Sequence, residues 1–148
     1  MKIFPSSPVV GIGVIVFNKD YVLIEKRGNE PGKGEWNLPG GTLMLGERIF
    51  ECAKREVSEE AGIEIEPIGI ATVYELIEKE GERVKFHYVI IDVVAEYLSG
   101  ETRVGSDALD LKWIKLEEVK DYPLPERVKD AIEKGRRVLK DGEGRSNR

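Results

Sequence analysis

Three glutamates, Glu56, Glu59 and Glu60, lie within five consecutive residues of the chain. If the segment is helical, spacings of three and four residues return to one face, so the carboxylates share an arc of about 100°. Like charges this close repel one another, and a cation among them removes that repulsion. Clustered carboxylate oxygens are typical ligands of Mg²⁺ and Mn²⁺. The pattern therefore predicts a divalent-metal site on a helix, which is suited to phosphoryl chemistry.

The residues around these glutamates predict a helix over about 47–61 to position them. Its apolar stripe comprises Ile49, Phe50, Ala53, Val57 and Ala61. Such a stripe packs a helix against a sheet and leaves the other faces polar. Gly46 precedes the segment, and Gly62 follows it where a left-handed C-terminal residue is expected. We therefore expect the acids to face a cleft at the edge of a sheet.

Residues 41–63, here called the box, resemble the signature of the Nudix hydrolases at every fixed or restricted position. These positions are Gly41, Glu47, Arg55, Glu56, Val57, Glu59, Glu60, Gly62 and Ile63. Residues 34–40, which lead into the box, also resemble the family. The resemblance implies an α/β fold, namely an α/β/α sandwich with a mixed β-sheet, one catalytic helix and one C-terminal helix. It also implies metal-dependent hydrolysis of a nucleoside diphosphate linked to another moiety, giving a nucleoside monophosphate.

The resemblance places the metal, Mg²⁺ or alternatively Mn²⁺, on Glu56, Glu59 and Glu60, with the backbone carbonyl of Gly40 as a further ligand. Glycine at that position lets the backbone approach a ligand closely. Arg55 is expected to pair with Glu47 or to orient Glu56, and so to hold the carboxylates in place.

The resemblance leaves the general base open between a glutamate of the box and an acid on a later loop. The matching loop, residues 102–110, offers Asp107 and Asp110. Asp107 follows Gly105 and Ser106 at the apex and is the preferred base, although an aspartate there equally suits capping of a turn.

Substrate contacts are predicted from residue type alone. Trp36, Phe86 and Tyr88 are candidates for an aromatic wall against a nucleobase, although such residues also build cores. Arg27 is a candidate for binding phosphate, although basic loop residues are often simply solvated.

The substrate class follows from features outside the box. ADP-ribose hydrolases of the family often carry a proline a modest distance downstream, whereas here Pro67 follows too closely and Pro123 lies far away. Nucleoside di- or triphosphates, as in MutT-like members, are therefore the preferred substrates, with ADP-ribose as the alternative. A non-catalytic nucleotide sensor is an alternative of another class, which the complete box disfavours. A homodimer is plausible because many members are dimeric.

Composition sets the remaining limits. The chain has 148 residues and a net charge of −5, which predicts one domain (1–140), a polar flexible tail (141–148) and no general nucleic-acid surface. Its single cysteine, Cys52, excludes an intrachain disulfide and suits the cytoplasm. No signal peptide or membrane span is expected.

The chain outside the box alternates strands and turns before a final helix. We expect strands over 9–17, 21–27, 36–38, 63–78 and 83–97, a further strand around Trp113, and a helix over 126–140. Gly11 and Gly13 lie within a strand that continues as strand, so they lack the strand-to-helix setting of a dinucleotide-binding loop.

Overall fold

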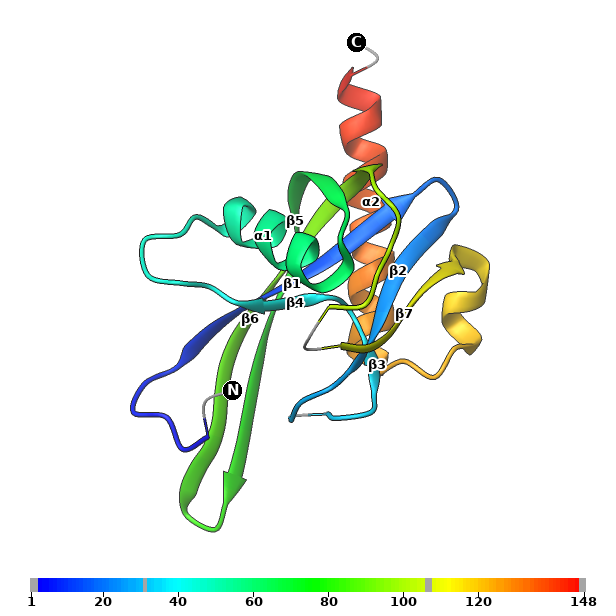
Figure 1. Ribbon diagram of the computed structural model, residues 1–148. Helices are drawn as coiled ribbons and strands as arrows, with labels where there is room; N and C mark the ends of the chain where they lie inside the picture. The colour runs from blue at the N-terminus through cyan, green and yellow to red at the C-terminus, as the bar shows by residue number, and fades with distance from the viewer. Residues whose placement is uncertain (1–2, 31, 106–107, 147–148) are drawn as a thin grey trace.

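The computed structural model describes residues 3–30, 32–105 and 108–146, with side chains as far as residue 142. Seven strands form one sheet: β1 (Val9–Asn18), β2 (Tyr21–Arg27), β3 (Trp36–Asn37), β4 (Gly40–Thr42), β5 (Glu64–Glu80), β6 (Arg83–Ser99) and β7 (Ala108–Lys115). The helices are α1 (Ile49–Ala61), the 3₁₀ helix η1 (Leu116–Asp121) and α2 (Glu126–Ser146) (Figure 1).

The sheet is mixed, and β1 is its central strand. The order is β3-β2-β1-β6-β5, with β4 paired to β1 and β7 paired to β2. β1 and β6 run parallel, whereas the other pairs are antiparallel. β4 and β2 occupy different stretches of the same edge of β1, since β4 pairs with residues 11–13 and β2 with residues 17–18. Along this edge, β1 therefore has two separate neighbours, first β4 and then β2.

The two long helices cover opposite faces of the sheet (Figure 1). Side chains alternate along β1, so that Ile12, Val14 and Val16 pack with α1, and Ile15 and Phe17 pack with α2. A strand buried on both faces requires a continuous apolar run, which β1 has. The predicted α/β fold with one helix on either side of a mixed sheet is confirmed.

Several element ends differ from those predicted. α1 begins at Ile49 instead of residue 47, because Gly46 turns the chain with φ = 82° and the Glu47 N–H donates to the Met44 carbonyl. α1 ends as expected, at Gly62 in the left-handed region (φ = 72°).

The end predicted for the last helix at residue 140 is wrong, because α2 continues to Ser146 into the segment assigned as a tail. Glycines there suggested an early end, but a glycine inside a helix costs about 1 kcal/mol and does not prohibit it. β5 and β6 also extend beyond their predicted ends and form a long hairpin that projects from the body (Figure 1).

Among the described residues, no helix is long and apolar enough to cross a membrane.

Candidate active site

Arg55 on α1 joins three of the acids of the box. Its Nε donates to Glu47 Oε2 at 2.6 Å and its Nη2 to Glu47 Oε1 at 3.0 Å. Its Nη1 donates to Glu56 Oε1 at 2.8 Å and to Glu59 Oε2 at 3.2 Å. The guanidinium therefore makes both contacts that the sequence left as alternatives, pairing with Glu47 and orienting Glu56.

Glu47 is held in this network through both of its carboxylate oxygens. Its Oε1 also accepts the Met44 N–H at 3.0 Å, so both carboxylate oxygens are held. The hydrogen bond from Arg55 lowers the pKa of Glu47 to about 2, and the acceptors around Arg55 raise the pKa of that guanidinium. Arg55 Nη2 also donates to the Thr42 carbonyl at 3.2 Å. The network thus ties α1 to β4 by charged hydrogen bonds, which are the stronger kind.

Glu56 and Glu60 are buried and line one cavity of about 710 Å³. Burial raises the pKa of Glu56, while Arg55 acts in the opposite direction. Gly41 allows β4 to pass close to this carboxylate, since a Cβ at Gly41 would lie 2.2 Å from the Glu56 carboxyl carbon. Gly40 lines the same cavity.

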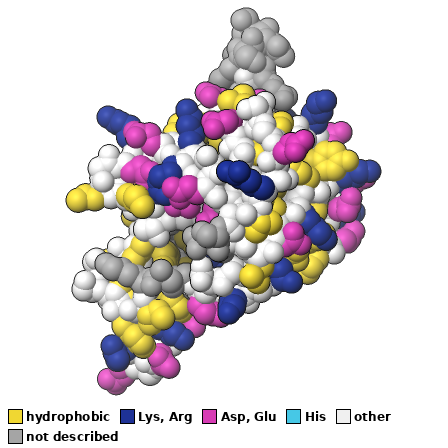
Figure 2. Space-filling view, in the orientation of Figure 1, with side chains coloured by type: hydrophobic (Ala, Val, Ile, Leu, Met, Phe, Trp, Pro, Cys, Tyr) yellow, Lys and Arg dark blue, Asp and Glu magenta, His cyan; other side chains and the backbone are white. Residues whose placement is uncertain are grey.

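Glu59 differs from the other two acids of the arc. Its side chain is 58% exposed and contacts Arg55, and it lies outside the described lining of the cavity. Among the described residues, no three His, Cys, Asp or Glu side chains are gathered as a metal site. Two carboxylates from one helix, which line one cavity together with Gly40, nevertheless fit the oxygen ligands of a hard divalent cation. Figure 2 shows acidic and basic side chains side by side over α1.

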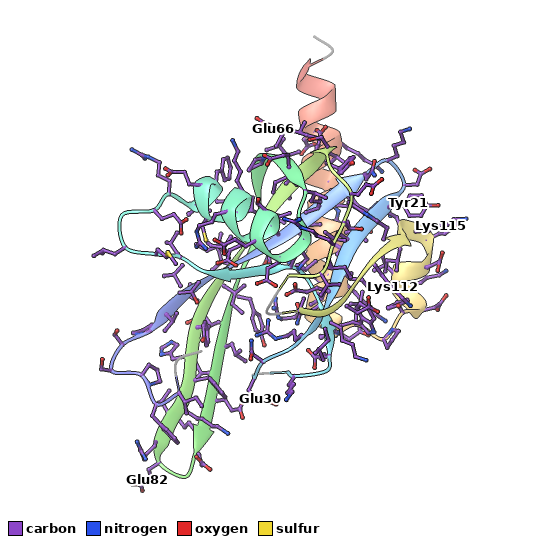
Figure 3. The ribbon with its side chains drawn as sticks, in the orientation of Figure 1. Tyr21, Glu30, Glu66, Glu82, Lys112 and Lys115 are labelled. Carbon is purple, nitrogen blue, oxygen red and sulfur yellow. The ribbon has the colours of Figure 1, made fainter. Side chains whose placement is uncertain are left out.

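The structure separates the four predicted substrate contacts. Arg27 and Tyr88 line the cavity. Phe86 is buried, and both it and Trp36 lie outside the described lining. Trp36 packs edge-to-face on Tyr122 at 6.1 Å between ring centroids, and the Lys112 ammonium, labelled in Figure 3, lies 5.5 Å from the Trp36 ring centroid. Trp36 thus packs against β7 and against the residue that follows η1.

The preferred general base, Asp107, lies outside the described residues. The preceding loop adjoins the last turn of α1, since the Arg103 N–H donates to the Ala61 carbonyl and the Gly105 N–H to the Glu60 carbonyl, both at 2.9 Å. Asp110 is exposed in β7, where its Oδ1 accepts the N–H of Leu111. The choice of base therefore stays a prediction.

The sequence reading missed Asp92 on β6 and Arg127 on α2, which both line the cavity. The Asp92 side chain is 1% exposed, and Arg127 Nη1 lies 3.6 Å from its Oδ2. Burial raises the pKa of Asp92 to about 6, against the opposing effect of Arg127. A charged residue inside the apolar run 88–94 was the available signal, since Asp is rarely buried in a strand without a reason.

Comparison with known proteins agrees with the fold and the box. Residues 7–135 match the family model of the NUDIX domain. The crystal structure of a MutT NUDIX hydrolase from Burkholderia pseudomallei superposes with a TM-score of 0.75 at 30% identity, covering 87% of this chain and 98% of that one. The chain therefore belongs to the Nudix family.

Two curated relatives carry specific names. One is the ADP-ribose pyrophosphatase of Methanocaldococcus jannaschii, 29% identical over 74% of this chain and 63% of its own length. The other is the 8-oxo-dGDP phosphatase NUDT18 of Danio rerio, 32% identical over 82% of this chain and 35% of its own length. The chain thus spans less than two thirds of either relative.

Proposed function

We propose that this protein hydrolyses a diphosphate bond in nucleoside diphosphate derivatives with the help of a divalent metal ion. The observation that carries the proposal is the pair of buried carboxylates, Glu56 and Glu60, that line one cavity beside the Arg55 network. A volume of about 710 Å³ lies within the range of small-molecule sites, which is roughly 300–1,000 Å³.

The metal in this proposal is Mg²⁺, with Mn²⁺ as the alternative. Glu56, Glu59, Glu60 and the Gly40 carbonyl would hold it. When bound, such an ion neutralises phosphate oxygens and lowers the pKa of a coordinated water.

The residues of the chain supply position and proton transfer. Arg55 holds the Glu56 carboxylate toward the cavity and anchors itself on Glu47. Asp107 is the proposed general base, and the contact of Gly105 with the backbone of Glu60 supports it by bringing the preceding loop to α1. A glutamate of the box is the alternative base.

The proposed substrates are nucleoside di- or triphosphates, with ADP-ribose as the second candidate. The name of the Danio rerio relative supports the first class, and that of the Methanocaldococcus jannaschii relative supports the second. Arg27 and Tyr88 are the proposed contacts for phosphate and base, because both line the cavity.

The test is a hydrolysis panel with Mg²⁺ and with Mn²⁺, read by chromatography. It contains nucleoside di- and triphosphates, their 8-oxo forms, ADP-ribose, dinucleoside polyphosphates, NADH and sugar nucleotides. We expect release of a nucleoside monophosphate from one class, abolished by EDTA. Binding of nucleotides without any product would instead favour the sensor alternative.

Variants assign the roles in the same assay. Glu56→Gln and Glu60→Gln should lose activity by about 10²-fold or more while remaining folded, and Asp107→Asn should do the same if it is the base. Glu51→Gln is the matched control on α1, because its side chain is 62% exposed and contacts Arg48. Full activity in Glu56→Gln would refute the metal assignment, and unchanged turnover in Asp107→Asn would refute the choice of base.

A further inference from the structure

A second charged pair, Asp92 and Arg127, lines the cavity outside the box. The Asp92 carboxylate is fully buried, and among the described residues neither of its oxygens accepts a hydrogen bond. Its nearest cation is Arg127, at an N–O distance of 3.6 Å, which exceeds hydrogen-bonding length. A buried carboxylate is costly unless it is compensated, so this position calls for a functional explanation.

The sheet fixes where this pair lies relative to the box. Gly40, Gly13 and Asp92 form one row across β4, β1 and β6. Neighbouring strands are about 4.8 Å apart, so the backbone of Asp92 lies about 10 Å from that of Gly40. A Cβ on Gly13 would lie 2.3 Å from Asp92 Oδ1, so glycine at this position provides the space for the carboxylate.

Arg127 is the member of the pair that can reach a ligand. Its side chain is 24% exposed, whereas the oxygens of Asp92 have no accessible surface. The guanidinium carbon lies 4.4 Å from the centroid of the Tyr74 ring, and Tyr74 also lines the cavity. The ion pair and the ring contact hold the guanidinium without using its N–H groups in hydrogen bonds, so these contacts leave its donors for a ligand.

We propose that Arg127 binds the substrate and that Asp92 is its positioning residue. A guanidinium only donates hydrogen bonds, so the group that it selects is an oxygen acceptor on the part of the substrate that lies beside Asp92 and Tyr74 in the cavity. Two sources offer that chemistry: the keto oxygen of a nucleobase and a phosphate oxygen. This inference rests on the proposed function, since it concerns the same cavity.

The test compares nucleotides that differ in one group, with binding measured by calorimetry in EDTA and turnover measured with Mg²⁺. ITP and ATP differ by a keto oxygen against an amino group on the base, and ITP and IDP differ by one phosphate. The variants are Arg127→Gln, Arg127→Lys and Asp92→Asn. Arg136→Gln is the matched control, because Arg136 lies on the same helix, pairs with Glu133 and is outside the described lining of the cavity.

We expect Arg127→Gln to change one preference by about tenfold or more, because a charged hydrogen bond to that group is lost. A fall in the preference for ITP over ATP identifies the base oxygen, and a fall in the preference for ITP over IDP identifies phosphate. Asp92→Asn should shift the same preference in the same direction by a smaller factor, and Arg127→Lys should restore part of it.

Two results would overturn the proposal: no binding of any of these nucleotides to the wild-type protein, or both preferences unchanged in Arg127→Gln. A parallel loss for all ligands, accompanied by a lower melting temperature, would show a structural role and also count against it. Binding measured in EDTA separates failure of this proposal from failure of the proposed function. Discrimination between nucleotides in that measurement does not require hydrolysis.

Discussion

Replacing Asp92 with asparagine should change the pH dependence of folding by an amount that can be worked out from its burial. Burial raises the pKa of Asp92 from 3.8 to about 6, even though Arg127 acts to lower it. Between these values the folded protein keeps the proton and the unfolded chain releases it. The wild-type protein therefore loses stability as the pH rises from about 4 to about 6. A pKa difference of about two units corresponds to about 3 kcal/mol.

The assay is urea unfolding of the wild-type protein and of Asp92→Asn at several pH values from about 4 to about 8. Asparagine is neutral throughout, so the stability of the variant relative to wild type should rise by about 3 kcal/mol across this range and level off above about pH 7. All other titrating groups are common to both proteins and cancel in the difference. Asp130→Asn is the control, because Asp130 is exposed beside Lys134. A difference that stays constant with pH would refute the reasoning.

Three further predictions concern Gly13 in the cavity and two residues of α1, Arg55 and Cys52. Gly13→Ala should destabilise the protein by about 1–3 kcal/mol in urea unfolding, because the new methyl group would overlap the Asp92 carboxylate. Arg55→Lys should lower kcat/KM by about 10- to 100-fold, since an ammonium cannot replace the two-pronged contact with the network of acids. The Cys52 thiol should resist Ellman's reagent at pH 8 until the protein is unfolded, because it is buried and burial raises its pKa to about 12.

The two substitutions have matched controls, and the labelling of Cys52 has an outcome that contradicts it. Gly142→Ala is the control for Gly13→Ala, because Gly142 lies on α2 with open space around it. This substitution should be neutral or slightly stabilising. Equal destabilisation by Gly13→Ala and Gly142→Ala would refute the predicted overlap with Asp92. Arg48→Lys changes an arginine whose side chain is 89% exposed and should leave kcat/KM unchanged. Rapid labelling of the native thiol would show that α1 opens from β4 more readily than its burial indicates.

The helix of the box could be predicted in detail because the pattern that specifies it lies within neighbouring residues. The spacing of the glutamates, the apolar stripe and Gly62 all lie within one helix, so the helix face and its C-terminal end follow from residue order. The start of α1 could not be placed in the same way. Glu47 looks helical by composition, but its contacts with Met44 and Arg55 hold it in the preceding turn.

Asp92 left a local signal as a charge inside an apolar run, but its pairing with Arg127 could not be predicted. The two residues come together only after β6 pairs with β1 and α2 packs on the sheet, and neither event leaves a pattern in neighbouring residues. The predicted aromatic wall stays a prediction, since residue type does not show which aromatic side chains of a strand line the cavity. Phe86 and Tyr88 lie two residues apart in β6, yet only Tyr88 belongs to the described lining.

The glycines of β1 and β4 explain how one cavity holds charges from both faces of the sheet. Gly11, Gly13, Gly40 and Gly41 all line it where the two strands pair. Gly41 makes room for Glu56 on the side of α1, and Gly13 makes room for Asp92 on the side of α2. At these four positions the paired strands carry no side chain, which leaves room for the carboxylates of Glu56 and Asp92.

Glu56 and Asp92 both lie against the paired strands β4 and β1, so the sheet sets the spacing between the box and the carboxylate beside Arg127. A substrate that binds at both ends must therefore match a fixed length. This constraint is a physical basis for selecting one class of nucleotide over another, and it applies whichever oxygen acceptor Arg127 recognises.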